Sequence, residues 1–120
     1  MLIDALLLED ERAAIRLSQC DLHAPVTVDA EFVHGLRRQW LRKRFDDEIA
    51  RAALRVFAGT PIVRHPVEPL IGRMWAIRQN VIAYDAGSVA LAESLDLPLL
   101  TRDRRLAHSS GHAARIEFIA

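Results

Sequence analysis

Helical segments and short apolar runs alternate along this chain of 120 residues, and that alternation limits its fold more than any other feature. The segments with helical periodicity are approximately 1–19, 26–42, 45–57, 67–78 and 83–94. The extended candidates are 22–25, 62–65, 97–100 and 116–119, and a short helix is expected from Asp103. Strands separated by helices pair in parallel, so the sequence predicts one α/β domain over 1–120 with three α/β/α layers and a mostly parallel sheet.

Two of the expected helices have a defined apolar face. The stripe on the segment 26–42 repeats every fourth residue and consists of Val28, Phe32, Leu36 and Trp40. The segment 45–57 is predicted to turn three residues inward, namely Ile49, Ala53 and Leu54. Both tryptophans, Trp40 and Trp75, lie at helical spacing with other apolar residues, which favours core or dimer packing over the stacking of nucleic-acid bases.

Composition excludes several classes of protein. The chain is 51% hydrophobic, enough to bury a core without disulfides, and its single cysteine, Cys20, indicates a reducing compartment. No apolar run reaches the roughly 18 residues that span a membrane, and no signal sequence is evident, so we expect a cytoplasmic protein. The net charge is zero, but arginine gathers in two basic clusters. Their members are Arg37, Arg38, Arg42, Lys43 and Arg44 in the first, and Arg102, Arg104 and Arg105 in the second.

Three acidic residues lie where solvated charge is not expected. Glu31 borders the apolar stripe, Asp85 opens a helix with small inward residues, and Asp103 directly follows a predicted strand. At the carboxyl edge of a parallel sheet such acids can converge, and carboxylates that converge need a divalent cation or raised pKa values. Mg²⁺ held in this way supports phosphodiester hydrolysis. The alternative for each is structural: helix capping or a favourable charge near the helix N-terminus for Asp85 and Asp103, and a surface ion pair for Glu31.

Four stretches in this order and spacing resemble the PIN-domain family. They are His23–Arg38 (HAPVTVDAEFVHGLRR), Arg73–Asn80 (RMWAIRQN), Ala83–Glu93 (AYDAGSVALAE) and Leu99–Ala107 (LLTRDRRLA). Each piece alone is weak evidence, but together they span nearly the whole chain. Within the family, the chain is similar to small bacterial toxin ribonucleases of VapC type.

The resemblance implies a function and a site. It implies that Glu31, Asp85 and Asp103 are the catalytic and metal-binding acids, with Thr101 as a supporting hydroxyl. It also implies Mg²⁺ or Mn²⁺ as cofactor, RNA as substrate, a homodimer, and a cognate antitoxin protein as partner. Ile82 stands where many relatives have threonine, so one polar contact of the site is missing here.

The first acid of the family pattern has two competing positions. Family members begin with a strand that ends in Asp, followed by a helix. In one register Asp4 is that residue, after the very short strand Met1–Ile3. In the other register Met1–Leu8 is already the helix, and the strand with its Asp lies upstream; the apolar pattern of this segment favours this second register. The second register predicts a weak nuclease. The alternative function is that of a degenerate, non-catalytic PIN domain that binds antitoxin or RNA.

Other candidate sites have less support. His108 and His112 have zinc-like spacing, but Gly111 between them breaks a helix and a third ligand is not evident. Cys20 has no partner in a recognisable nucleophile pattern and reads as a small buried residue. A receiver-like phosphoryl-transfer domain would need a lysine after its last strand, whereas the single lysine is Lys43.

Overall fold

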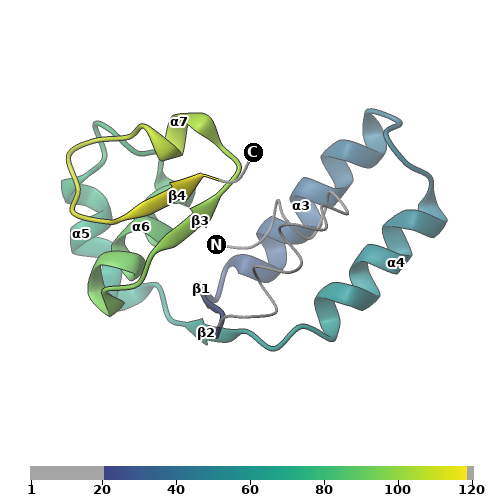
Figure 1. The fold of residues 1–120 in the computed structure, drawn as a ribbon, viewed down its shortest axis with the longest axis horizontal. Coiled ribbons are helices and arrows are strands. Elements are labelled where there is room, and N and C mark those ends of the chain that lie inside the picture. Colours follow the sequence, from purple (N-terminus) through teal and green to yellow (C-terminus); the bar gives the residue numbers. More distant parts are fainter. Residues whose placement is uncertain (1–20, 119–120) are drawn as a thin grey trace.

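The computed structural model describes residues 21–118, and it follows the predicted alternation of helices and strands (Figure 1). The elements are β1 (His23–Pro25), α3 (Val28–Leu41), α4 (Asp47–Ala58), β2 (Val63–His65), η1 (Glu68–Leu70), α5 (Ile71–Ala76), α6 (Ala83–Leu95), β3 (Leu99–Thr101), α7 (Arg104–Ala107) and β4 (Ile116–Phe118). The predicted helix 1–19, the two positions for the first acid and Cys20 lie outside the described residues. Within residues 21–118, no helix is both long and apolar enough to cross a membrane.

The described strands are all parallel to their partners, which confirms the predicted α/β class. They form two sheets of two strands each, β1 with β2 and β3 with β4, instead of one continuous sheet. In the first pair His23 lies opposite Val63, and Pro25 lies opposite His65. Helix α6 packs against β1 of one pair and β3 of the other, so it joins the two halves of the molecule.

The first half contains the α3–α4 hairpin, whose core is built around two aromatic rings. Phe32 of α3 and Phe57 of α4 stack with ring centroids 4.1 Å apart and planes 10° from parallel. Ala50 and Ala53 lie on the same face of α4, at helical spacing from Phe57. Stacked aromatic rings bury much apolar area, so this contact sets the rotation of α4 about its axis.

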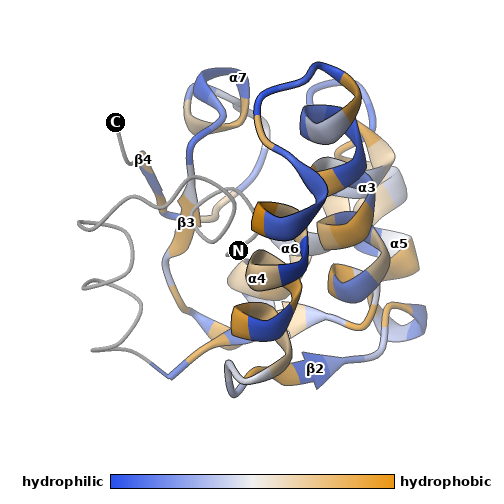
Figure 2. Ribbon diagram, turned by 90° about the vertical axis from the view of Figure 1, so that its right-hand side faces the viewer, coloured by the Kyte–Doolittle hydropathy of each residue, from blue (hydrophilic) through white to orange (hydrophobic). Residues whose placement is uncertain are grey.

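That rotation overturns part of the predicted apolar faces. Ile49 and Leu54 were expected to point inward, but both are exposed on the flanks of α4 because Phe57 and the two alanines take the inner face. Figure 2, in which α4 lies toward the viewer, shows hydrophobic residues on its outer side. Trp40 and Trp75 are exposed as well, so core packing is wrong for both tryptophans, although the rest of the α3 stripe is buried.

The second half is organised around α6. Every residue from Ala86 to Ala92 is buried in this helix, and Val89 is inaccessible to solvent. Its inward residues pack with Ile77, Leu99 and Leu106, which come from the segment after α5, from β3 and from α7. The predicted inward set of Ala86, Val89 and Ala90 is therefore confirmed. A helix buried on nearly all sides is a rigid support for residues at its ends.

The predicted helix 67–78 is interrupted. The structure has the 3₁₀ turn η1 followed by the short helix α5, which ends at Ala76. Pro69 lies at the start of this segment and has no N–H to donate, which suits the first turn of a helix but not its interior. Helix α5 packs against α6.

Candidate active site

Glu31 lies near the start of α3, directly after β1. Helix α3 begins beside the carboxyl end of that strand because Val28 and Phe32 bury their side chains in the first core cluster. The hydroxyl of Thr27 donates a hydrogen bond of 3.0 Å to Oε1 of Glu31. Glu31 is half-buried, so its carboxylate remains in contact with solvent while Thr27 orients it.

Asp85 lies in the first turn of α6 and is half-buried. It directly precedes the buried run of this helix, so its backbone is held by the most closely packed element of the described chain. The N-cap position of α6 is Ile82, whose exposed side chain cannot accept a hydrogen bond from the backbone. The missing polar contact that the sequence predicts at Ile82 corresponds to a missing side-chain cap of this helix.

Asp103 lies at the N-cap position of α7, immediately beyond β3. Its Oδ1 accepts a hydrogen bond of 2.9 Å from the backbone N–H of Arg105. Its own N–H donates to Oγ1 of Thr101 at 3.0 Å, so Thr101 supports the turn that carries Asp103. The capping alternative is therefore real for this residue. A carboxylate has two oxygens with several lone pairs, however, so a capping Asp can still contact a cation.

The topology brings these three acids toward one side of the molecule. Gly87 lies two positions after Asp85 and against the end of β1, since a Cβ atom there would be 3.9 Å from Cγ of Pro25. Strand β1 leads directly into the turn before Glu31. Helix α6 also packs on β3, the strand it leads into, and therefore runs back along it, which puts its first turn toward the end of β3 that precedes Asp103.

The same part of the chain does not complete a metal site by itself. Within residues 21–118, no three side chains of His, Cys, Asp or Glu lie close enough together to hold a metal ion. The chemistry of the three acids nevertheless suits Mg²⁺, which takes oxygen ligands and commonly binds one or two carboxylates plus water and substrate phosphate. The three acids therefore have the type of ligand atom that Mg²⁺ prefers, but fewer than three protein ligands come together among the described residues.

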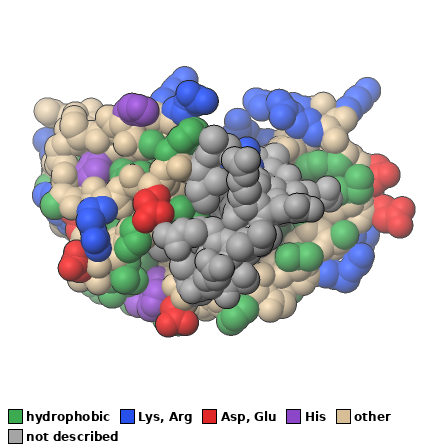
Figure 3. Space-filling view, viewed as in Figure 1, with side chains coloured by type: hydrophobic (Ala, Val, Ile, Leu, Met, Phe, Trp, Pro, Cys, Tyr) green, Lys and Arg blue, Asp and Glu red, His purple; other side chains and the backbone are tan. Residues whose placement is uncertain are grey.

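Two groups of cations lie along one edge of the molecule (Figure 3). Figure 3 shows lysine and arginine side chains in two groups along the upper edge, over the α7 region and over the far end of α3, and the outline dips between them. The two basic clusters predicted from the sequence lie in these parts of the chain, since Arg42, Lys43 and Arg44 follow α3 and Arg104 and Arg105 belong to α7. Arg104 also lies over the ring of Phe118, with its guanidinium carbon 5.2 Å from the ring centroid. Groups of positive charge along one edge can attract and position a phosphate backbone.

Two further carboxylates form close ion pairs that serve the fold. Glu93 accepts two hydrogen bonds from Arg73, at 2.8 and 2.7 Å, and a third from the N–H of Ala113. The pKa of Glu93 is lowered, chiefly by the hydrogen bonds from Arg73, whose effect is larger than the opposite effect of burial. Asp29 binds Arg64 in the same two-pronged way at 2.7 and 2.8 Å, and this contact lowers the pKa of Asp29. The first pair ties α5 and the loop before β4 to α6, and the second ties β2 to α3.

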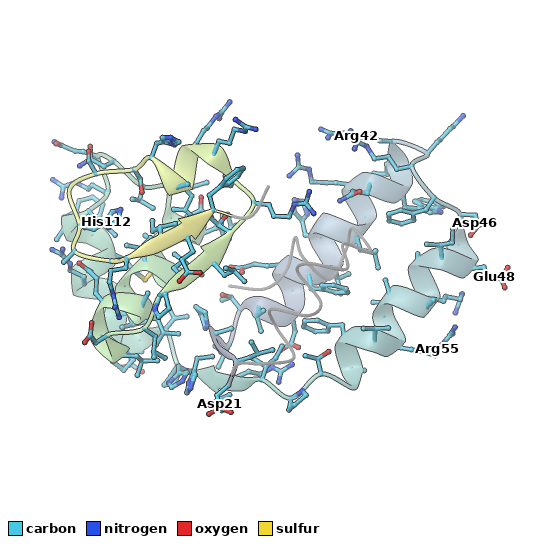
Figure 4. All side chains as sticks on the ribbon, in the orientation of Figure 1. Asp21, Arg42, Asp46, Glu48, Arg55 and His112 are labelled. Atoms are coloured by element: carbon cyan, nitrogen blue, oxygen red, sulfur yellow. The ribbon has the colours of Figure 1, made fainter. Side chains whose placement is uncertain are left out.

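The contact between Ser109 and His112 in the second half resembles the serine–histidine pair of a hydrolase triad. His112 lies on the loop that precedes β4 (Figure 4), and its Nε2 is 2.7 Å from Oγ of Ser109. Its Nδ1 accepts the N–H of Ala114, so the ring proton is on Nε2 and points at the serine. A histidine in this tautomer cannot take the serine's proton, and Ser109 itself donates to the carbonyl of Leu106. The contact between Ser109 and His112 therefore stabilises the loop and has no catalytic geometry. His108 does not share it, because its Nδ1 is hydrogen-bonded to the carbonyl of Arg104.

Comparison with known proteins shows the family to which the chain belongs. Residues 2–111 match the PIN domain family. The VapC ribonuclease Mb0985 of Mycobacterium bovis is 43% identical over 103 residues, which cover 86% of this chain and 81% of the relative. Ribonuclease VapC1 of Mycobacterium tuberculosis is 45% identical over 98 residues, 81% of this chain and 74% of the relative. Ribonuclease VapC12 of the same species is 36% identical over 107 residues, covering 89% and 83%.

These matches and the parallel α/β architecture define a PIN-domain protein, and the chain belongs to that family. Within it, the chain groups with the VapC ribonucleases, to which it is similar over most of its length. The family predicted from the sequence is confirmed. The roles of Glu31, Asp85 and Asp103 stay predictions, which the arrangement of the three segments supports.

Proposed function

We propose that this protein is an endoribonuclease that depends on Mg²⁺ or Mn²⁺ and acts as the toxin of a type II toxin–antitoxin pair. One observation carries the proposal: the start of the buried helix α6 holds Asp85 beside the end of β1 and toward the end of β3, the strands that precede the other two acids. The relatives named as VapC ribonucleases support the reaction class.

Each acid has its own role in this proposal. Asp85 is the principal metal ligand because it lies on the most rigid support, and Glu31 and Asp103 supply further carboxylate oxygens, directly or through water. A divalent ion held there supplies the chemistry of phosphodiester hydrolysis, since it activates water as a nucleophile and stabilises the leaving oxygen. Thr27 and Thr101 are positioning residues, because they orient the carboxylate of Glu31 and the turn of Asp103.

The basic clusters are proposed to bind the RNA backbone. Arginine pairs well with phosphate through two parallel N–H donors, and such contacts position a nucleic acid without reading its sequence. We further propose that the protein works in the cytoplasm as a homodimer and is inhibited by its cognate antitoxin. Exposed apolar residues such as Trp75, which is 68% exposed, provide surface for contacts with protein partners.

The experiment is a cleavage assay on a structured RNA with single-stranded loops, in Mn²⁺ and in EDTA. The purified chain should cleave in Mn²⁺ and stop in EDTA. Asp85→Asn should lower the initial rate by about 100-fold or more, because one ligand of the charge-stabilising site is lost. Asp96→Asn is the matched control: Asp96 is an exposed helix-end acid with positive φ, a conformation that asparagine tolerates, and its rate should equal that of the wild type.

The outcome also decides between the proposal and its alternative. Cleavage that persists in EDTA, or an Asp85→Asn variant as fast as the wild type, contradicts the proposal. An absence of cleavage even in Mn²⁺, with RNA or antitoxin still bound, identifies the chain as a non-catalytic PIN domain. Asp4→Asn tests the two registers of the first acid. The substitution should lower the cleavage rate if Asp4 is that acid and leave the rate unchanged if it is not.

A further inference from the structure

Two histidines contact each other across the first pair of strands, and neither belongs to the three proposed acids of the nuclease site. His23 lies on β1 and His65 at the end of β2, and Nδ1 of His23 is 2.9 Å from Nε2 of His65. The ring centroids are 5.1 Å apart, and the ring planes are inclined by 33°. In the strand register His23 faces Val63, so His65 is its diagonal neighbour on the same face of the pair.

The backbone holds the two rings in place. The N–H of Val26 donates to the carbonyl of His65, and the N–H of Val63 donates to the carbonyl of Leu22, both at 2.8 Å. Ala24, between the paired positions, is inaccessible to solvent and packs in the core of the first half. Both histidines are half-buried, which limits their rotamers but leaves a path for solvent and ions. The two nitrogen atoms are thus kept close by the fold itself.

Two neutral imidazole nitrogens at this separation can chelate a transition metal. Metal–nitrogen bonds of about 2.0–2.1 Å that end on atoms 2.9 Å apart enclose an angle of roughly 90°. That is the angle between neighbouring ligands in the tetragonal sites that Cu²⁺ and Ni²⁺ prefer. Tetrahedral zinc would require the nitrogen atoms to separate by about 0.4 Å more. The ring that now donates the hydrogen bond has to move its proton to its other nitrogen, and both rings have to turn, so that the two lone pairs leave the line between the nitrogens and point at one ion.

We propose that His23 and His65 form a binding site for a divalent transition metal, with affinity in the order Cu²⁺, then Ni²⁺ and Zn²⁺. Water completes the coordination. Mg²⁺ does not compete, because it takes oxygen ligands. An ion bound here bridges β1 and β2 and thereby stabilises the strand pair that leads into α3. The site is separate from the proposed nuclease site and does not depend on that function.

The test is calorimetric titration of the full chain with NiCl₂ in excess MgCl₂, which keeps carboxylate sites occupied. We expect one Ni²⁺ per chain. His23→Gln and His65→Gln should each weaken binding by about tenfold or more, because a chelate is reduced to one imidazole. His108→Gln is the matched control, since His108 lies in the other half of the molecule, and its affinity should match the wild type. An absence of Ni²⁺ binding, or equal affinity in all four proteins, overturns the proposal.

A second measurement covers the case in which either variant fails to fold. Ni²⁺ is paramagnetic, so in a proton NMR spectrum of the wild type it should broaden the ring signals of two of the five histidines first. Signals that broaden together in all five, or first in His108 or His112, place the ion elsewhere and contradict the proposal.

Discussion

The two halves of the molecule bury their helices to very different extents. In the second half α6 has an uninterrupted buried run from Ala86 to Ala92, whereas in the first half α4 has only Ala50 and Phe57 buried. Helix α4 instead leaves Ile49, Leu54 and Val56 exposed. One half therefore resembles the centre of a domain, and the other resembles a hairpin that is held together by one aromatic stack and joined to α6 through β1.

The difference separates support from contact surface. A fully packed helix such as α6 tolerates little movement, and it carries the acid with the largest proposed role in catalysis. A half-covered hairpin has apolar flanks and a basic far end, which suit contacts with other molecules. Glu31 lies at the start of this hairpin, so the proposed active site joins the rigid half to the exposed one.

The largest predicted effect comes from the same substitution in the two halves. Leu91 on α6 is 4% exposed and packs with Leu70 and Ala90, whereas Leu54 on α4 is 39% exposed. Leu91→Ala should lower the free energy of unfolding by about 2–5 kcal/mol, through lost burial and a cavity. Leu54→Ala should cost about 1 kcal/mol or less. Denaturant unfolding measures both, and equal losses would refute the contrast between the halves.

The two arginine–carboxylate pairs provide the second test. Glu93→Gln should cost about 1–3 kcal/mol, because Glu93 is largely buried and also holds the N–H of Ala113. Asp29→Asn should cost less, since its pair with Arg64 is exposed and screened by solvent.

The same pair predicts a pH dependence. The pKa of Glu93 is lowered in the folded state from its ordinary value of 4.5, so its contribution is complete above that pH. The contribution is lost as pH falls through the folded pKa. The stability difference between wild type and Glu93→Gln should therefore shrink below about pH 4.5. A difference that grows in acid would reverse the assigned sign.

Helix capping gives the smallest effects, of opposite sign in the two halves. Oδ1 of Asp46 accepts the N–H of Ile49 at 2.9 Å and caps α4, so Asp46→Ala should cost about 0.5–2 kcal/mol. Helix α6 has the uncapped Ile82 at the same position, so Ile82→Thr should raise stability by about 0.5–1 kcal/mol. Ile82→Val is the control, because it changes shape without adding an acceptor. If Ile82→Thr and Ile82→Val have the same midpoint of thermal unfolding, a missing helix cap does not limit the stability of α6.

Local patterns in the sequence predicted most of the described elements. The segments predicted as helices at 26–42 and 83–94 are Val28–Leu41 and Ala83–Leu95 in the structure, because their apolar spacing persists over several turns. The strand predicted at 62–65 is Val63–His65. Short-range spacing and turn residues decide such elements, so they are visible before any tertiary contact is known.

Contacts between distant segments could not be predicted in this way. Periodicity places Leu54 and Phe57 on neighbouring stripes of one helix, and only the stack on Phe32 decides which stripe faces inward. The His23–His65 contact depends on strand register, which brings together residues 42 positions apart. The three acids were recognised through the order of the family motifs, and spacing alone would have left each of them with a structural explanation.

Calorimetric titration with Mg²⁺ determines whether acids from both halves of the molecule bind one ion. Glu31→Gln removes a carboxylate from the hairpin half, Asp85→Asn removes one from the rigid half, and Asp96→Asn is the control. If both acids bind the ion, the wild type binds Mg²⁺, the first two variants each bind it at least about tenfold more weakly, and the affinity of the control is unchanged. Wild-type affinity in Glu31→Gln or in Asp85→Asn would contradict a shared site at the junction of the halves.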